Sequence, residues 1–170
     1  VDSFYASVAA LLAPRLGGAS TLLEVGCGAG YSTERLAPLV PDGCQFLACD
    51  VGPSLVSAAK MRNPGVSVSR QSVYSLALPD KSVDVVVMLE VMEHLDDPAR
   101  ALAELDRVTR RHIIVSTPRE PIWRALNFMR GKYMRDWGNT PGHLQHWSSR
   151  GLQRFMRTRF DVQDMRQPLP

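Results

Sequence analysis

Two glutamates and a histidine follow the apolar run at residues 84–89. Glu90, Glu93 and His94 stand at positions i, i+3 and i+4, and on a helical turn this spacing places all three side chains on one side. Two carboxylates and an imidazole that face one point suit a divalent ion such as Mg²⁺ or Mn²⁺. A solvated helix start has the same composition, because acidic residues are favoured at a helix N-terminus. A metal site and a capped helix start both remain open at this point.

Two further histidines, His143 and His146, lie downstream, just before Trp147. An imidazole can accept and release a proton near neutral pH, which makes histidine the usual general base. His94, His143 and His146 are therefore the candidate catalytic bases of this chain.

A glycine cluster follows the first apolar run of the chain, with Gly26, Gly28 and Gly30 at alternate positions. Glycines allow tight turns and a close approach of the backbone to a ligand. The dinucleotide fingerprint needs a third glycine at its sixth position. Counted from Gly26 that position is Tyr31, and counted from Gly28 it is Thr33. The spacing therefore argues against a pyrophosphate-binding loop and against an NAD or nucleotide-sugar enzyme.

Asp50 ends the apolar run 45–50, twenty residues beyond Gly30. A carboxylate at the end of the second strand of a nucleotide-binding sheet can accept hydrogen bonds from both hydroxyls of a ribose. The same residue could also cap a helix that begins near Pro53. Because the glycine loop accompanies it, we favour ribose binding.

Alternating strands and helices must position these residues. Apolar runs predict strands at residues 21–25, 45–50, 66–69, 84–89, 112–116 and 160–162. Helical spacing predicts helices at residues 2–16, 31–40, 53–61, 98–109 and 149–157. This alternation predicts an α/β, doubly wound, mostly parallel sheet with helices on both faces. Ligands of such sheets bind beyond the carboxyl ends of the strands, where the candidate residues fall.

The composition fits one soluble domain over residues 1–170, with 45% hydrophobic and 22% charged residues. No run of 18 apolar residues occurs and the first residues lack a basic region, so we expect neither a membrane span nor a secretory signal. Cys27, Cys44 and Cys49 form no CxxC pair, which argues against a disulfide framework. Together these features lead us to expect a cytoplasmic protein.

Positive charge is concentrated in the second part of the chain. Residues 1–97 carry 6 Lys/Arg against 11 Asp/Glu, and residues 98–170 carry 14 against 6. A basic half could face an anionic acceptor, a membrane surface or RNA, or could simply be a solvated face. Residues 118–147 are too long for a simple connection and mix arginines with aromatic residues. We expect this segment to cover the substrate side of the site, although a small satellite core would have the same composition.

Four segments resemble the class I S-adenosylmethionine (SAM)-dependent methyltransferases, of the type 11/12-like kind: LLEVGCGAGYST, LACD, LPDKSVDVVVMLEVMEHLDDP and IIVSTP. The resemblance runs over roughly residues 20–165 and implies a Rossmann-like fold. It implies that the backbone around Gly26 and Gly28 holds the methionine part of SAM, with Glu24 near its amino group. It further implies that Asp50 binds the ribose.

Other cofactor contacts follow from the same resemblance. Val51 would pack against the adenine, and Leu89 would lie beneath the methionine moiety. The family often has an Asp after the third strand, to contact the adenine amino group, whereas here Ser72 stands at that place, followed by Val73. A hydroxyl can still accept that bond. The family also has a seventh strand, antiparallel to the sixth, which we do not find before Pro170.

The pattern ExxEH followed by HxxxW resembles two subfamilies, the small-RNA 3′-terminal 2′-O-methyltransferases and the O-methyltransferases of ubiquinone biosynthesis. In the RNA subfamily the pattern binds a divalent ion that engages the substrate hydroxyls. Carried over, the metal ligands would be Glu90, Glu93, His94 and His143, with His146 as a neighbour that could substitute.

The sequence therefore predicts a SAM-dependent methyltransferase that methylates a hydroxyl of a small molecule or sugar and releases S-adenosylhomocysteine, with or without Mg²⁺ or Mn²⁺. One alternative is RNA ribose 2′-O-methylation, which the histidine pattern and the basic half favour. An alternative of another class is a non-catalytic SAM-binding scaffold or regulatory module, in which the acid and histidine cluster would have no purpose.

Overall fold

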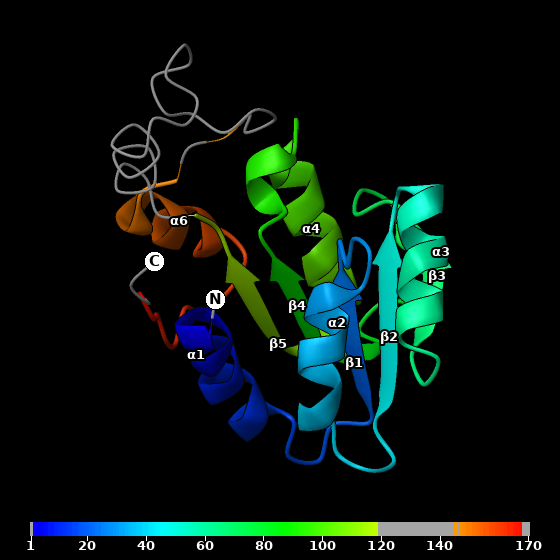
Figure 1. Cartoon of the computed structure of the whole chain (residues 1–170). Helices are drawn as coiled ribbons and strands as arrows, with labels where there is room; N and C mark the ends of the chain where they lie inside the picture. Colours follow the sequence, from blue (N-terminus) through cyan, green and yellow to red (C-terminus); the bar gives the residue numbers. More distant parts are fainter. Residues whose placement is uncertain (1, 119–144, 146, 168–170) are drawn as a thin grey trace, which may run out of the picture.

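The computed structural model describes residues 2–118, 145 and 147–167 and contains a parallel sheet (Figure 1). Its strands are β1 (Thr21–Val25), β2 (Gln45–Asp50), β3 (Ser67–Arg70), β4 (Val83–Leu89) and β5 (Thr109–Ser116). They lie in the order β3-β2-β1-β4-β5, and every pair is parallel. The direction of the strand order reverses between β1 and β4, which is the switch point where such sheets bind ligands.

Helices cover both faces of this sheet (Figure 1). They are α1 (Asp2–Leu12), α2 (Tyr31–Leu36), α3 (Pro53–Arg62), α4 (Pro98–Val108) and α6 (Ser149–Met156), with 3₁₀ turns η1 (Ala13–Arg15), η2 (Ala37–Leu39) and η3 (Met92–His94). Side chains of α1 and α2 pack in one core cluster with Val85 and Val87, while side chains of α4 and α6 pack in another with Val86 and Met88. Successive residues of β4 therefore point to opposite layers, as the period of a strand requires.

β4 is the central element of the core. All seven of its residues are buried, and it pairs with β1 on one side and with β5 on the other. A parallel strand covered on both faces reads as a continuous apolar run, which is the pattern that residues 84–89 display. The predicted α/β, doubly wound, parallel fold is therefore confirmed.

A buried carboxylate holds the amino-terminal ends of the central strands together. Asp84 is 1% exposed, and its Oδ2 accepts a hydrogen bond from the Ser20 amide at 2.7 Å. Its Oδ1 accepts from Arg110 Nε at 2.8 Å and from the terminal nitrogen Nη2 at 2.5 Å. Burial by itself would raise the pKa of Asp84, but the amide and guanidinium donors outweigh it and lower the pKa. The carboxylate is therefore bound in its charged form.

Several predicted boundaries differ from the structure. The helix expected at 31–40 ends at Leu36, and a 3₁₀ turn continues it, because Pro38 has no amide hydrogen for the helical ladder. The strand expected at 160–162 is wrong: these residues form no strand, and Phe160 and Val162 pack against the core from irregular chain after α6. These apolar side chains are partly buried by packing against the core, although their segment is not a strand.

Most of the predicted cover at 118–147 lies outside the described residues. The assignment of that segment to the substrate side, and of residues 1–170 to a single domain, stays a prediction. Among the described residues, no helix has the length and apolar character needed to cross a membrane.

Candidate functional site

The carboxyl ends of β1, β2 and β4 bring together three chain segments that are far apart in the sequence. The glycine loop follows β1, Val51 and Gly52 follow β2, and residues 90–94 follow β4. Register places β1 directly between the other two strands, with Glu24 beside Ala48 and Val87. The predicted cofactor residues of these segments and His94 therefore share one edge of the sheet.

The glycine loop is packed at one glycine and open at the next. The amides of Gly26 and Cys27 donate to the Cys49 carbonyl at 2.8 and 3.0 Å, which ties the loop to the end of β2. Gly26 has φ +77°, and a Cβ atom there would lie 2.4 Å from Val91 Cγ2. Gly28 has φ +53°, but a Cβ atom there would meet nothing within 4 Å. The loop is therefore closely packed at Gly26, against Val91 in the segment after β4. At Gly28 it leaves open space, where a ligand can approach the backbone.

Asp50 shapes the loop and still has acceptor capacity. Its Oδ2 accepts a hydrogen bond from the Gly28 amide at 2.9 Å, and its Oδ1 accepts from the Gly52 amide at 2.8 Å. A carboxylate offers about four lone-pair sites, so each oxygen can accept one further bond. The neighbouring Val51 side chain is 63% exposed. An acceptor beside an uncovered apolar side chain fits the ribose and the adenine of a nucleoside.

Glu24 is a buried acid with one unsatisfied oxygen. The residue is 1% exposed, and its Oε2 accepts a hydrogen bond from Thr33 Oγ1 at 2.6 Å. Its Oε1 is buried and has no partner among the described residues. Burial raises the pKa of Glu24, while the hydroxyls of Ser32 and Thr33 oppose that rise. Because a buried unpaired acceptor is costly, this oxygen fits a ligand donor such as an amino group.

The remaining predicted cofactor residues differ in exposure. Ser72 is half-buried in a turn that the Ser75 amide closes on its carbonyl at 3.0 Å, and its Oγ accepts from the Tyr74 amide at 3.3 Å. Val73 and Leu89 are each 9% exposed and pack in the core clusters. The cofactor roles of these three residues stay predictions.

The segment after β4 is not the helical turn that the sequence predicted. Glu90 has φ +56° and Val91 has φ −121°, so helical geometry begins only with η3 at Met92. As a result Glu90 is exposed while Glu93 is buried, and the expectation that the acids share one face of a helix is wrong. Glu90 turns toward β5, where its Oε1 accepts a hydrogen bond from Ser116 Oγ at 2.7 Å. Although the residue as a whole is exposed, neighbouring atoms partly desolvate its carboxyl group and raise the pKa of Glu90, and that hydrogen bond opposes the rise.

Glu93 is held in an environment that favours its neutral form. It is 2% exposed, and its Oε2 has no partner among the described residues. Burial raises the pKa of Glu93 to about 8, and the charge of Glu90 adds to that rise. Its Oε1 lies 4.0 Å from His94 Nε2. A carboxyl that keeps its proton at neutral pH, next to an imidazole, is an acid–base pair at the end of the central strand.

The predicted metal ligands are only partly described by the structure. Among the described residues, no group of three His, Cys, Asp or Glu side chains is arranged to hold a metal ion. Glu90 and Glu93 point into different surroundings, as shown above, and the predicted fourth ligand His143 lies outside the described residues, as does His146. The predicted Mg²⁺ or Mn²⁺ site, whose ligand set includes a residue outside the described ones, stays a prediction.

A later segment of the chain does reach this edge. The Gln145 amide donates to the Glu93 carbonyl at 2.9 Å, and the Trp147 ring packs against Phe155 of α6 with 4.9 Å between ring centres. The sequence had connected this segment with the acids only through a resemblance to HxxxW. The hydrogen bond between Gln145 and Glu93 shows that the two segments are in contact in the folded protein.

Two hydroxyl residues were not recognised from the sequence. Thr33 supplies the hydrogen bond to Glu24, and Ser116 supplies the one to Glu90. Ser116 ends a predicted strand of this sheet, and that position was an available signal. Thr33 lies nine residues from its partner and follows a glycine turn, so its contact depends on the folded loop.

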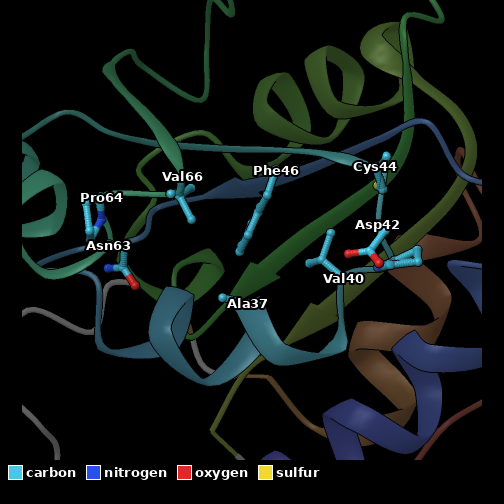
Figure 2. A pocket seen from close by; sticks show the side chains of 11 residues that line it. Ala37, Val40, Asp42, Cys44, Phe46, Asn63, Pro64 and Val66 are labelled. Carbon is cyan, nitrogen blue, oxygen red and sulfur yellow. The ribbon is translucent and has the colours of Figure 1, made fainter.

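The described residues also line a surface pocket of about 420 Å³ (Figure 2). Its lining includes Val40, Cys44, Phe46, Asn63 and Val66. These residues come from the end of η2, the amino-terminal part of β2 and the turn before β3. Most of the lining therefore lies toward the opposite ends of the strands from Asp50, while Asn63 joins the pocket to the glycine loop through its hydrogen bond to the Gly30 carbonyl.

Comparisons with known proteins agree with this geometry. A family profile described as a methyltransferase domain matches residues 23–115. A probable S-adenosylmethionine-dependent methyltransferase of Mycobacterium tuberculosis is 42% identical over 109 residues, covering 63% of this chain and 38% of that protein. A ubiquinone biosynthesis O-methyltransferase of Xanthomonas euvesicatoria is 35% identical over 121 residues, covering 66% of this chain and 49% of that protein. The chain spans half or less of the length of these two relatives.

Among solved structures, the YcgJ protein of Bacillus subtilis matches with a TM-score of 0.67 at 19% identity, over 89% of this chain and 66% of that one. At this identity the likeness concerns the fold alone, and it agrees with the class I arrangement of the sheet. The family match spans the glycine loop, Asp50 and the acids after β4. The chain therefore belongs to the family of class I SAM-dependent methyltransferases.

Proposed function

We propose that this protein transfers a methyl group from SAM to a hydroxyl oxygen of a small-molecule or sugar acceptor and releases S-adenosylhomocysteine. The observation that carries the proposal is the carboxyl edge of the sheet. There, the open space at Gly28, the acceptor Asp50 and the unpaired oxygen of Glu24 lie on adjoining strands, next to the pair of Glu93 and His94.

The cofactor side uses groups of matching chemistry. Asp50 would accept hydrogen bonds from the ribose hydroxyls while its bonds to Gly28 and Gly52 keep it in place. Glu24 would accept from the amino group of the methionine part, which gives its buried Oε1 a partner. The exposed Val51 would cover one face of the adenine. When bound, SAM supplies an electrophilic methyl group on a sulfonium sulfur.

The acceptor side needs positioning and a destination for one proton. Methyl transfer depends chiefly on in-line placement of the attacking oxygen, which a closed site supplies. We assign the proton of the acceptor hydroxyl to the His94 imidazole, which lies beside the neutral carboxyl of Glu93. His143 and His146 are the alternative bases. Support for oxygen as the acceptor atom comes from the similarity to the Xanthomonas enzyme, whose name describes an O-methyltransferase. No step is assigned to a metal ion.

The cofactor half of the proposal is tested by calorimetric titration of S-adenosylhomocysteine. The wild type is expected to bind one equivalent. Asp50→Ala is expected to lose binding, because it removes both the ribose acceptor and the partner of the Gly28 amide. Asp161→Ala, which changes an exposed acid after α6, is the matched control. A wild type that produces no binding heat and no thermal stabilisation by the ligand would overturn the proposal.

The catalytic half is tested with SAM labelled on its methyl group and a panel of catechols, phenols, sugars and short RNAs. We expect mass spectrometry to locate the label on an oxygen of a small acceptor. His94→Ala should lower kcat, with His143→Ala and His146→Ala measured beside it. Label found only on nitrogen or carbon would refute O-methylation, and label only on RNA would favour the ribose alternative.

A further inference from the structure

The two halves of the glycine loop have different supports. The first half is tied to β2 through the Cys49 carbonyl and the Asp50 carboxylate, as described above. The second half, Ala29 to Tyr31, lies against the end of α3. Contacts there come from Arg62 and Asn63, the last residue of the helix and its C-cap.

Asn63 bonds directly to the loop. It is 6% exposed, and its Nδ2 donates to the Gly30 carbonyl at 3.0 Å and to the Ala59 carbonyl at 3.2 Å. A Cβ atom at position 30 would lie 2.5 Å from that nitrogen and 2.9 Å from Ala59 Cα. The loop and the last turn of α3 are therefore in contact with no space between them.

Arg62 holds the same stretch from the solvent side. Its Nε donates to the Ala29 carbonyl at 3.2 Å, and the carbon of its guanidinium lies 3.7 Å from the centre of the Tyr31 ring. Its Nη1 lies 3.6 Å from Glu34 Oε2. The Tyr31 side chain is 62% exposed, so the core does not hold it. A planar guanidinium that stacks on a ring while donating to a carbonyl orders both groups at once.

We propose that Arg62 and Asn63 are positioning residues of the cofactor site, which act through the glycine loop. They hold Ala29, Gly30 and Tyr31 so that the neighbouring Gly28 keeps the open conformation that receives the cofactor. The inference rests on the proposed function, because it takes SAM as the ligand of that loop.

The expected effect is on binding, because the contacts of Arg62 are to backbone and to an exposed ring. Its own side chain is 31% exposed, so its loss leaves the core clusters unchanged. If the receptive loop is then populated about one tenth of the time, the apparent Kd rises about tenfold, since apparent affinity scales with the competent fraction.

Arg62→Ala carries the test, because Asn63 is buried and its replacement would also remove its side-chain hydrogen bond to the Ala59 carbonyl within α3. Arg35→Ala is the matched control: Arg35 also faces a tyrosine ring, 5.7 Å from Tyr5, and an acid, 3.9 Å from Asp2, but does not touch the loop. Arg62→Lys keeps the charge near Glu34 without the planar group. For each protein we would measure the Kd of S-adenosylhomocysteine, the KM for SAM, kcat at saturating SAM, and amide hydrogen exchange of residues 28–31 without ligand.

We expect Arg62→Ala to raise the Kd and the KM for SAM about tenfold, with kcat at saturating SAM retained. Amide exchange of residues 28–31 should accelerate, Arg62→Lys should recover binding only in part, and the control should behave as wild type. A wild type that binds while Arg62→Ala binds equally well overturns this inference alone, as does a fall in kcat with unchanged Kd. A wild type that does not bind overturns the proposed function and this inference with it.

Discussion

Glu93→Gln is expected to make the protein more stable in alkaline solution while leaving its stability near pH 5 almost unchanged. Glu93 is buried at the end of β4, with one carboxylate oxygen unpartnered among the described residues. Its neutral form suits this environment, and glutamine has nearly the same shape as a protonated glutamate but cannot ionise. The substitution therefore removes the cost of ionisation and little else.

The magnitude follows from the pKa. Burial raises the pKa of Glu93 from 4.5 to about 8, so between these values the folded protein keeps a proton that the unfolded chain has released. The contribution of Glu93 to the free energy of unfolding is therefore fully present below the unfolded pKa. As pH rises it is lost by about 1.4 kcal/mol per pH unit, and the loss levels off above the folded pKa. Over the whole window the loss approaches about 5 kcal/mol, and we expect Glu93→Gln to recover roughly 3 to 5 kcal/mol at pH 8.5.

The assay is urea unfolding followed by circular dichroism, at pH 5 to 9, for the wild type and the variant. The quantity of interest is the difference between their free energies of unfolding at each pH. Glu34→Gln, at an exposed acid of α2, is the control, and its difference from wild type should stay constant over this range. A difference for Glu93→Gln that is equal at pH 5 and pH 8.5 would refute the reasoning, because Glu93 would then ionise as an ordinary glutamate.

Three further predictions concern Asp84, the glycine loop and the metal ion. Asp84→Ala should lower the free energy of unfolding by about 3 kcal/mol at pH 7, since it leaves buried donors unpaired. Because the pKa of Asp84 is lowered, urea titrations should show that this difference shrinks as pH falls below about 4, through the folded pKa. Gly26→Ala should unfold at clearly lower temperature, because its Cβ would collide with Val91, whereas Gly28→Ala should fold with a smaller loss and bind S-adenosylhomocysteine more weakly. Methyl transfer should continue in excess EDTA, and a loss that Mg²⁺ restores would contradict a metal-free route.

Much of the sheet could be predicted because its signals are local. The buried run around β4 and the positions of β1, β2 and β5 follow from apolar runs that end in glycine or acidic residues. The glycine loop and Asp50 also meet as expected, since carboxyl ends of neighbouring parallel strands share one edge. The error at residues 160–162 has a clear cause: a short apolar run fits a packing segment as well as a strand.

The site was predicted less completely. The spacing of Glu90, Glu93 and His94 assumed a helix, but one left-handed residue at the start separates the two acids. Periodicity does not predict the left-handed conformation of Glu90, because it accompanies tertiary contacts: the close packing of Val91 on Gly26 and the hydrogen bond from Ser116. The local pattern likewise singled out neither Arg62 nor Asn63, which follow the helix predicted at residues 53–61.

The sequence by itself determined the family, the order of strands and helices, and which segments reach the carboxyl edge of the sheet, because periodicity and motif spacing are properties of neighbouring residues. Only the tertiary structure decided that Glu93 is buried while Glu90 is exposed, that Thr33 and Ser116 donate hydrogen bonds to the acids, and that the end of α3 contacts the glycine loop. Those properties depend on desolvation and on contacts between residues up to 33 positions apart, which arise when the chain packs.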